Sequence, residues 1–407
     1  MEDEAIDAYD EHEHDHEEMF VELPQPPRRS SRIPVPNKQW WIVDNRNPVH
    51  FAYRAAENLD DDPVMRKAAR DKEIDTIRSY KTWKLGPKPN DRKAVGCKWV
   101  DTIKRDGMYK SRLVVRGFSQ IEGVDFFDTF APVAKPTTVR IFLVICNNKK
   151  MSIHQSDVTA AYLNGIMDEE IYMEQPPGYI QQGENGQKLY CKLLKALYGT
   201  KQAGRAWRKV IKEFLLLIGF EICVFDPCLF FKGSNDTLII VIVWVDDLLT
   251  GYHGSNIDGF NMFWSQLAGK FNVTSLGMIS DYVGMNITHD IERCEMRINQ
   301  RENIRKMLRH FEMENASERY TPLNTNWQLT GVGAEVYVDK PYRSLIGCLL
   351  YPTQWTRPDI SYAIGSLSQY KTTSTSTTMA ELEALYHAVT EGIWIYEFLK
   401  SFGLVLL

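Results

Sequence analysis

Helix and strand periods of apolar and polar positions become recognisable only from about residue 60 onward. In the first half of the chain these periods predict two helices, one hairpin and one strand. The helices cover 62–80 and 138–146, the hairpin joins 95–100 to 112–118 around Asp106-Gly107, and the strand 153–158 leads into a helical turn at 160–163. Ordered structure is therefore expected to begin near residue 60.

The clearest helix is predicted at 206–219, where Gly219 ends the pattern because glycine is a poor helix former. Its charged residues occupy the face opposite a single apolar stripe. The stripe consists of Ala206, Trp207, Val210, Ile211, Phe214, Leu215 and Ile218. A basic helix over 300–312 is the other helix predicted in this half of the chain.

The most apolar run, 238–245, predicts a buried strand that is rich in β-branched residues. A strand at 228–232 and a Gly-Ser-Asn-Asp turn precede it. Asp246 and Asp247 then interrupt the apolar pattern, and 248–252 is predicted as the returning strand. The expected result is a tight hairpin that carries two carboxylates at its tip.

Charge is distributed unevenly along the chain, although the net charge is only −5. Residues 1–40 hold eleven acidic against four basic residues, whereas 81–116 hold eleven basic against three acidic residues. The second stretch is either a local footprint for phosphates or an ordinary solvated basic surface. Seven scattered cysteines without a Cys-x-x-Cys pair predict free thiols in a reducing compartment. No window approaches the roughly 18 apolar residues of a membrane span, and no secretory signal is recognised.

A charged pair directly after an apolar strand breaks the hydrophobic pattern, and such breaks tend to be functional. Two adjacent carboxylates stay ionised together when a cation neutralises them, and clustered Asp side chains suit Mg²⁺. A third carboxylate on a neighbouring strand would allow two ions about 3.5–4 Å apart. Asp157, where a short strand turns into helix, is the candidate. An ordinary pair of turn carboxylates is the commoner explanation of Asp246-Asp247, so the pattern alone leaves both interpretations open.

Longer motifs surround these aspartates. Residues 155–165 read QSDVTAAYLNG and resemble the first palm motif of copia-type retrotransposon reverse transcriptases. Further stretches resemble that family in its own order: KSRLVVRGFSQ (110–120) and FAPV (130–133) upstream, EIYMEQPPGY (170–179), LYGTKQAGRAW (197–207) and WVDD (244–247) downstream, then YRSLIG (342–347) and TRPDI (356–360). The resemblance covers roughly residues 60–407.

The resemblance implies an α+β fold of the right-hand polymerase type. The implied parts are a disordered acidic and then proline-rich, basic linker (1–59), fingers (60–150), a palm with the catalytic hairpin (151–270), a small helical thumb (271–325), a connection (326–371) and a truncated ribonuclease H-like remnant (372–407). In the remnant, Glu381 matches one catalytic carboxylate of that domain, but the strand bearing its first Asp is missing. Ribonuclease H activity is therefore not expected.

The resemblance also implies the roles of individual residues. Asp157, Asp246 and Asp247 would bind two Mg²⁺ ions, for which Mn²⁺ is a possible substitute, and the Val158 carbonyl group would touch one of them. Primed RNA or DNA template and dNTPs would be the partners, with no membrane, while dimerisation and association with a virus-like particle stay open. The expected location is intracellular, in the cytoplasm or the nucleus.

Six more residues are implied to bind the nucleotide: Tyr162, Tyr198, Gly199, Lys98, Lys110 and Arg112. Tyr162 corresponds to the aromatic residue under the incoming sugar, and Gly199 would let the backbone approach the ligand closely. The three basic residues would contact the triphosphate. The plainer alternatives are a core aromatic ring for Tyr162 and a solvated surface position for each basic residue.

The chain departs from the family at several positions, including Trp244 in place of Tyr and Gly204 in place of Pro. The main hypothesis is an RNA-directed DNA polymerase. The alternative is a degenerate, non-catalytic remnant that at most binds nucleic acid, because Trp244 lies beside the aspartates and could crowd the primer end. A metal-dependent nuclease would also use clustered carboxylates.

Overall fold

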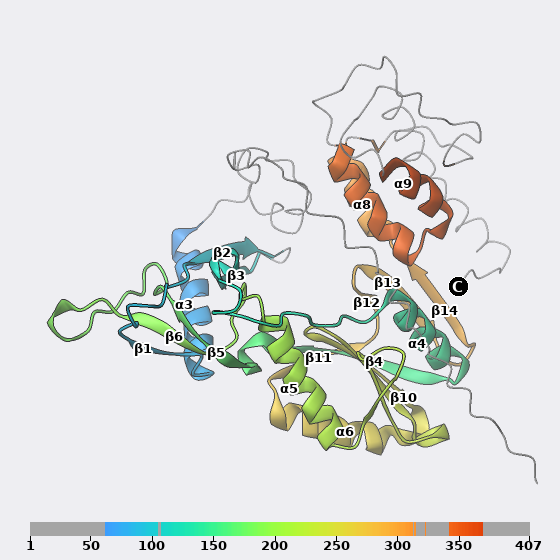
Figure 1. Ribbon diagram of the computed structural model, residues 1–407. Helices are drawn as coiled ribbons and strands as arrows, with labels where there is room; N and C mark the ends of the chain where they lie inside the picture. The colour runs from blue at the N-terminus through green and yellow to red at the C-terminus, as the bar shows by residue number, and fades with distance from the viewer. Residues whose placement is uncertain (1–61, 105–106, 312, 315–321, 323–341, 369–407) are drawn as a thin grey trace, which may run out of the picture. The chain divides into compact units, whose positions relative to one another are not determined.

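The computed structural model describes residues 62–104, 107–311, 313–314, 322 and 342–368 (Figure 1). The described residues form a mixture of helices and sheets, which confirms the predicted mixed class. The predicted tail at 1–59, the remnant at 372–407 and much of the connection lie outside the described residues.

The helices agree with the sequence where its pattern was strong. The predicted helix 206–219 begins three residues earlier than expected, and α6, α8 and α9 were not predicted. The helices are α3 (Pro63–Ser79), α4 (Pro136–Asn148), α5 (Ala203–Leu217), α6 (Ile257–Lys270), α7 (Arg301–His310), α8 (Tyr342–Trp355) and α9 (Ser361–Ser368).

The strands of the described residues form four antiparallel sheets, ordered β11-β4-β10-β9-β8-β7, β1-β6-β5, β12-β13-β14 and β2-β3. The predicted hairpin around Gly107 and the predicted aspartate hairpin are both confirmed, as β2–β3 and β9–β10. The strands are β1 (Trp83–Gly86), β2 (Cys97–Ile103), β3 (Tyr109–Val115), β4 (Met151–Val158), β5 (Ile166–Met173), β6 (Tyr190–Lys195), β7 (Glu221–Ile222), β8 (Leu229–Lys232), β9 (Ile239–Trp244), β10 (Asp247–His253), β11 (Val273–Met278), β12 (Asp281–Tyr282), β13 (Met285–Asp290) and β14 (Glu295–Asn299).

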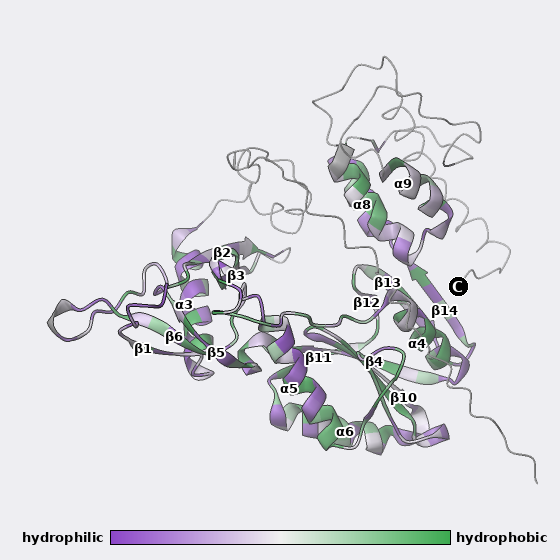
Figure 2. Cartoon of the chain, viewed as in Figure 1, coloured by the Kyte–Doolittle hydropathy of each residue, from purple (hydrophilic) through white to green (hydrophobic). Residues whose placement is uncertain are grey.

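The six-stranded sheet is buried on both faces because its central strands are apolar on both sides. Helix α4 packs on one face, where Phe142 meets Ile153 and Leu249 in one core. Helices α5 and α6 cover the other face, where Trp207 and Phe263 belong to a second core (Figure 1). The colouring of α5 in Figure 2 alternates between hydrophilic and hydrophobic along the helix, as expected for a helix with one buried stripe.

A third core joins segments that the expected domain boundaries separate. Leu113 of β3 and Ile77 of α3 share it with Leu163, Ile171 and residues of β6. Residues 161–197 of the expected palm therefore pack with the expected fingers, and α4 of the expected fingers packs on the six-stranded sheet. These cores are assembled from segments that lie far apart in the sequence.

The expectation of a small helical thumb over 271–325 is wrong for its first part. β11 joins the six-stranded sheet beside β4, and β12–β14 form a sheet of their own before α7. Met285–Thr288 of β13 and Glu295–Asn299 of β14 do alternate between apolar and polar positions, a signal that the sequence analysis missed, whereas β11 has no such alternation. α7, α8 and α9 share a separate small core.

Two sequence predictions concern features outside these elements. All seven cysteines are free, as predicted. Across the described part of the chain, no helix combines the length and the apolar character needed to cross a membrane.

Candidate active site

The structure brings Asp157 and Asp247 together as direct neighbours across two strands. Asp157 lies one residue before the end of β4, and the register of β4 with β10 pairs it with Asp247. Paired residues of adjacent strands point to the same face of a sheet. Ile153 lies four residues before Asp157, and Leu249 lies two residues after Asp247, so their side chains point to the same face as the carboxylates. Both pack toward α4, and the carboxylates therefore lie at the end of that apolar face.

Asp246 occupies the turn between β9 and β10. Asp247 pairs with Trp244, which leaves Val245 and Asp246 as the two turn residues. Val245 has a φ of 57°, a left-handed conformation that β-branched residues rarely adopt and that costs about 1–3 kcal/mol. Two hydrogen bonds hold this turn: the Val158 N–H donates to the Asp246 carbonyl (2.8 Å), and Trp207 Nε1 donates to the Val245 carbonyl (2.5 Å). The backbone position of Asp246 is therefore fixed by its contacts with β4 and α5.

The three carboxylates influence one another electrostatically. Burial, together with the charges of the Asp246 and Asp157 carboxylates, raises the pKa of Asp247 to about 6. Burial also raises the pKa of Asp157, as does Asp246, whereas nearby basic residues act in the opposite direction. Half-buried like charges of this kind are stabilised by a cation.

The chemistry of this donor set fits a hard divalent cation, which prefers oxygen ligands. Among the described residues, no three His, Cys, Asp or Glu side chains are grouped closely enough to hold a metal ion as they stand. The aspartates are thus neighbours whose side chains do not converge on one point.

The basic hairpin places Lys98, Lys110 and Arg112 on one face. In the register of β2 with β3, Lys98 is opposite Val114, and Arg112 and Lys110 are two residues apart. Lys110 and Arg112 lower the pKa of Asp157, so their charges reach the carboxylates, and Lys104 does so as well. Burial lowers the pKa of Lys110, and the Arg112 and Lys104 cations lower it further, which is the environment of a site that an anion would stabilise.

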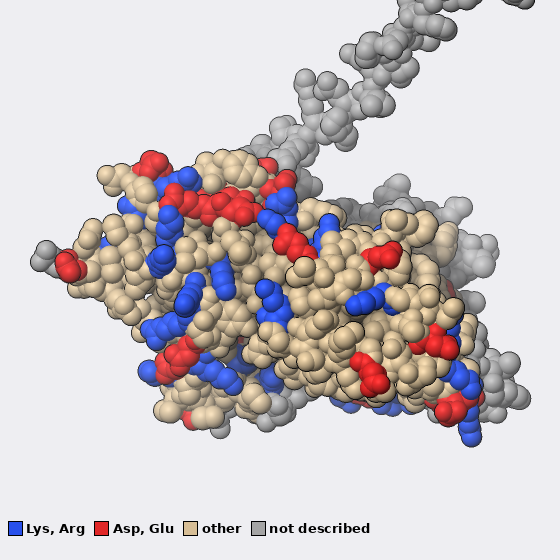
Figure 3. Space-filling model, turned by 90° about the horizontal axis from the view of Figure 1, so that it is seen from below, with Lys and Arg blue, Asp and Glu red and all other residues tan. Residues whose placement is uncertain are grey.

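Lys98 shares this face but is exposed, and Lys104 was missed by the sequence analysis. The only available signal for Lys104 was its place within the basic stretch 81–116. On the face drawn in Figure 3, the coloured Lys and Arg side chains stand in separate groups among Asp and Glu. Lys and Arg therefore do not form one continuous basic surface on that face.

Two tyrosines lie beside the carboxylates. The rings of Tyr162 and Tyr198 meet edge to face with centroids 5.0 Å apart, and the Arg112 guanidinium lies 5.4 Å from the Tyr198 ring centroid. Burial raises the pKa of Tyr198 to about 12, and burial followed by the Asp246 charge raises the pKa of Tyr162. Tyr162 is half-buried, so its ring is neither a closed core residue nor a free surface residue.

Gly199 is required by its contact with β3. It has a φ of 92°, and a Cβ atom there would lie 2.1 Å from the Val115 carbonyl oxygen. The Val115 N–H donates to the Tyr198 carbonyl at the same crossing (2.7 Å). The expected reason for this glycine was close approach to a ligand, whereas the close approach in the structure is to the backbone of the basic hairpin.

Trp244 points to the same face as Asp247 and packs within the chain. Its ring centroid lies 6.3 Å from that of Tyr282 on β12 and 5.9 Å from that of Trp355 on α8. Arg140 of α4 donates to the Trp355 carbonyl (2.9 Å) and so ties α8 to the same face. The position beside the aspartates is as expected, but the ring belongs to an aromatic cluster of this chain.

Two arginines of α5 differ in how accessible they are. Arg205 pairs with Asp128 at the surface (3.0 Å). Arg208, expected on the charged face of the helix, is half-buried, lies 5.0 Å from the Phe230 ring centroid and donates to the Pro227 carbonyl. Its Nη2 is thus engaged within the protein, while Nε and Nη1 are buried without a hydrogen-bond partner among the described residues.

Comparisons with known proteins agree with the motifs. The family described as "Reverse transcriptase (RNA-dependent DNA polymerase)" matches residues 80–325. The retrovirus-related Pol polyprotein from transposon TNT 1-94 of Nicotiana tabacum is 33% identical over 365 residues, 85% of this chain and 27% of that protein. The corresponding polyprotein from transposon RE1 of Arabidopsis thaliana is 35% identical over 305 residues, 73% of this chain and 20% of that protein.

A more distant relative is the transposon Ty1-BR Gag-Pol polyprotein of Saccharomyces cerevisiae, 26% identical over 328 residues, 74% of this chain and 18% of that protein. The chain thus spans between 18% and 27% of the length of these relatives. The family match covers more than half of the chain. The chain therefore belongs to the reverse transcriptase family, as a region of a copia-type retrotransposon Pol polyprotein.

Proposed function

We propose that this chain is an RNA-directed DNA polymerase that transfers a nucleotidyl group from a dNTP to the 3′-hydroxyl of a primer on an RNA or DNA template. The observation that carries the proposal is the pairing of Asp157 with Asp247 beside Asp246, within reach of the charges of Lys110 and Arg112. Acidic ligands next to basic side chains suit a substrate that arrives as a metal-bound triphosphate.

Asp157, Asp246 and Asp247 would hold two Mg²⁺ ions, or Mn²⁺ as a substitute, with the Val158 carbonyl as a further contact. When bound, the ions would lower the pKa of the attacking hydroxyl group and neutralise the leaving pyrophosphate. The turn at Val245 would hold the Asp246 backbone in one position throughout the catalytic cycle, because its hydrogen bonds to β4 and α5 are already made.

The remaining proposed contacts belong to the nucleotide. Arg112 can bind two phosphate oxygens at once with its planar guanidinium, and Lys110 adds a point charge. Tyr162, supported by the Tyr198 ring, would pack under the sugar and exclude a 2′-hydroxyl group. In this proposal the six-stranded sheet is the palm, and the β2–β3 hairpin with the β1-β6-β5 sheet forms the fingers.

A primer-extension assay on an RNA template with dNTPs and MgCl₂ tests the proposal. The wild-type protein should extend the primer, and Asp246→Asn, which keeps the size of the side chain, should not. Absence of extension by wild-type protein with either MgCl₂ or MnCl₂ would end the proposal. Release of nucleotides from unprimed DNA would instead indicate a nuclease.

Trp244 gives the non-catalytic alternative a definite test. If the wild-type protein binds primed template but does not extend it, while Trp244→Tyr does, the indole ring is the block. If neither protein extends the primer, the ring alone does not account for the inactivity. The packing of Trp244 against Tyr282 and Trp355 favours an indole ring that keeps its position with and without bound primed template.

A further inference from the structure

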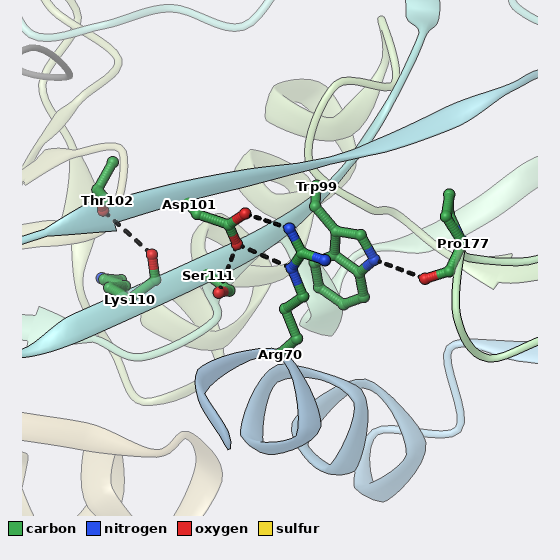
Figure 4. Close-up of polar contacts among 7 residues, drawn as sticks. All are labelled: Arg70, Trp99, Asp101, Thr102, Lys110, Ser111 and Pro177. Atoms are coloured by element: carbon green, nitrogen blue, oxygen red, sulfur yellow. Dashed lines mark hydrogen bonds and ion pairs between the residues drawn. The ribbon is translucent and has the colours of Figure 1, made fainter. Parts of the chain in front are cut away.

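Helix α3 is joined to the basic hairpin by a network centred on Arg70 (Figure 4). Arg70 Nε donates to Asp101 Oδ1 of β2 (3.1 Å), and its Nη2 pairs with the other oxygen of the same carboxylate. Ser111 Oγ of β3 donates to Asp101 Oδ1 (2.7 Å). One arginine of α3 is therefore connected to both strands of the hairpin.

The same network reaches the loop that follows β5. The Arg70 guanidinium lies 5.5 Å from the Trp99 ring centroid, and Trp99 Nε1 donates to the Pro177 carbonyl (2.9 Å) (Figure 4). Tyr179 of that loop packs against Trp99 with ring centroids 5.6 Å apart and donates its hydroxyl hydrogen to Asp71 of α3 (2.6 Å). Helix, hairpin and loop are thus held as one unit.

Glu73, one turn after Arg70, completes the contact along β3. Its carboxylate accepts a hydrogen bond from the Leu113 N–H (3.4 Å), and burial raises its pKa while the charges of Arg112 and Lys110 lower it. The Val115 N–H, two residues further along β3, donates to the Tyr198 carbonyl. These contacts satisfy donors of β3 that its one partner strand, β2, leaves unpaired.

The alternation of side chains along β3 links this network to the candidate active site. Ser111 is buried on the face toward Asp101, and its neighbours Lys110 and Arg112 point to the opposite face. A displacement of β3 that breaks the Ser111 contact must therefore also move Lys110 and Arg112. A two-stranded hairpin has little stability of its own, so its position depends on the helix that packs against it.

We propose that Arg70 and Glu73 are positioning residues for nucleotide binding: α3 fixes the β2–β3 hairpin so that Lys110 and Arg112 are held at the triphosphate. The inference rests on the proposed polymerase function. α3 ends at Ser79, directly before the region 80–325 that the family match covers. The inference therefore assigns a role to a helix outside that region. The side chains of Arg70 and Asp101 are 29% and 26% exposed, which protects their pairing from water more than at a surface ion pair.

Arg70→Gln in the full chain is the main test, with steady-state primer extension as the first measurement. The KM for dNTP should rise about ten-fold while kcat stays within about two-fold, because binding of the triphosphate changes and the aspartates do not. Arg70→Lys should recover only part of the loss, since lysine cannot form the two-pronged contact with Asp101. Asp75→Asn, on an exposed face of the same helix, is the matched control and should leave KM unchanged.

Two further measurements separate positioning from folding and from the proposed function. Combining Arg70→Gln with Asp101→Asn should raise KM little beyond the larger single effect, as expected for residues that act as one unit. Hydrogen exchange of residues 97–115 should be faster in Arg70→Gln than in wild type, and this result does not require activity. If the wild type cannot extend primers but Arg70→Gln still exchanges faster over 97–115 than wild type does, the polymerase is rejected and the role of α3 in holding the hairpin is supported.

The opposite pattern overturns the inference. If the variant shows unchanged KM with a lower apparent kcat, and unchanged exchange over 97–115, Arg70 only contributes to the amount of folded enzyme. Glu73→Gln provides a second, independent variant, since it keeps the size of the side chain and removes the charge near Arg112. If the wild type is active and the KM for dNTP is unchanged in both Arg70→Gln and Glu73→Gln, the proposal is also rejected.

Discussion

The two hairpins that supply charges to the candidate site are supported in different ways. β9–β10 lies in the middle of a six-stranded sheet with helices on both faces, and residues 239–243 of β9 are buried. β2–β3 is a two-stranded sheet that depends on α3 and on the crossing at Gly199. The acidic hairpin is built into a core, whereas the basic hairpin is attached to one.

This difference suggests a division of work. Residues whose backbone is enclosed on all sides open only with global unfolding, whereas a hairpin with few buried contacts can open locally. Changes in β9–β10 should therefore alter the chemical step, and changes in β2–β3 should mainly alter nucleotide binding.

Removal of a carboxylate should have the largest effect. Asp157→Asn should lower kcat on the order of a thousand-fold, because a neutral amide is a poor ligand for the ions of the proposed reaction. Asp236→Asn, in the exposed turn between β8 and β9, is the matched control and should retain full activity. Binding of primed template to Asp157→Asn, measured by filter retention, should stay near the wild-type level. A kcat within ten-fold of wild type would remove Asp157 from the proposed site.

The basic hairpin should respond more weakly and in a different constant. Arg112→Met should raise the KM for dNTP about ten-fold, since it removes a forked contact with phosphate but leaves the aspartates unchanged. Lys98→Met is the comparison, because Lys98 shares the face but is exposed, and its effect should be under about two-fold. An equal effect of both substitutions would mean that the face acts only through its total charge.

The burial of Asp247, together with the charges of Asp246 and Asp157, predicts a pH dependence of stability. The pKa of Asp247 is about 6 in the folded protein against an ordinary 3.8, so between these values the unfolded chain loses its proton first. The folded state then binds more protons, and the free energy of unfolding contributed by this group falls as the pH rises from about 4 to about 6 and does not recover above that. Added MgCl₂ should therefore raise the Tm more at pH about 7.5 than at pH about 5.

Thermal unfolding of wild type and Asp247→Asn measures this effect directly. The variant should lose less stability than wild type over the same pH range and gain less from MgCl₂, because asparagine has no charge to titrate. Identical pH profiles of the two proteins would show that neither burial nor the neighbouring carboxylates shift the pKa of Asp247.

The sequence predicted the acidic hairpin well because local signals determine it. An apolar β-branched run followed by two acids predicted a tight turn at 246–247. The structure has the same hairpin with its turn one residue earlier, at 245–246, so that Asp247 begins β10 and pairs with Trp244. The place of Asp157 near the end of a strand was also predicted from the sequence. Its pairing opposite Asp247 is a long-range register, which no local period encodes, and only the family resemblance indicated it.

The basic hairpin was predicted as an element but not in its support. Nothing in 62–80 indicates that Arg70 will meet Asp101 and Glu73 the Leu113 N–H, since both are charged residues on a polar helix. The need for Gly199 was attributed to a ligand because the crossing with Val115 involves residues that are distant in the chain. Within the segment 271–325, which was expected to be a helical thumb, β11 was missed for a similar reason, because it is defined by its pairing with β4.

The smallest predicted effect compares one buried tyrosine from each region. Tyr282, beside the aspartate hairpin, is fully buried, and its hydroxyl has no hydrogen-bond partner among the described residues. Tyr172, on β5 of the β1-β6-β5 sheet, is 6% exposed, and its hydroxyl donates to Glu170 (2.8 Å). An unsatisfied buried hydroxyl group costs roughly 1–3 kcal/mol, whereas a satisfied one contributes about 1 kcal/mol.

Tyr282→Phe should therefore raise the free energy of unfolding by roughly 1 kcal/mol, and Tyr172→Phe should lower it by a similar amount. Denaturant unfolding of the two variants and wild type measures both changes, and unchanged slopes with denaturant would show that the unfolded state is the same. If Tyr282→Phe destabilises the protein as much as Tyr172→Phe does, the Tyr282 hydroxyl has a hydrogen-bond partner. The candidate is the carboxylate of Asp247, whose charge contributes to the raised pKa of Tyr282. In that case a loss of extension activity in Tyr282→Phe should accompany the loss of stability, because the same hydroxyl would then be holding a carboxylate of the proposed active site.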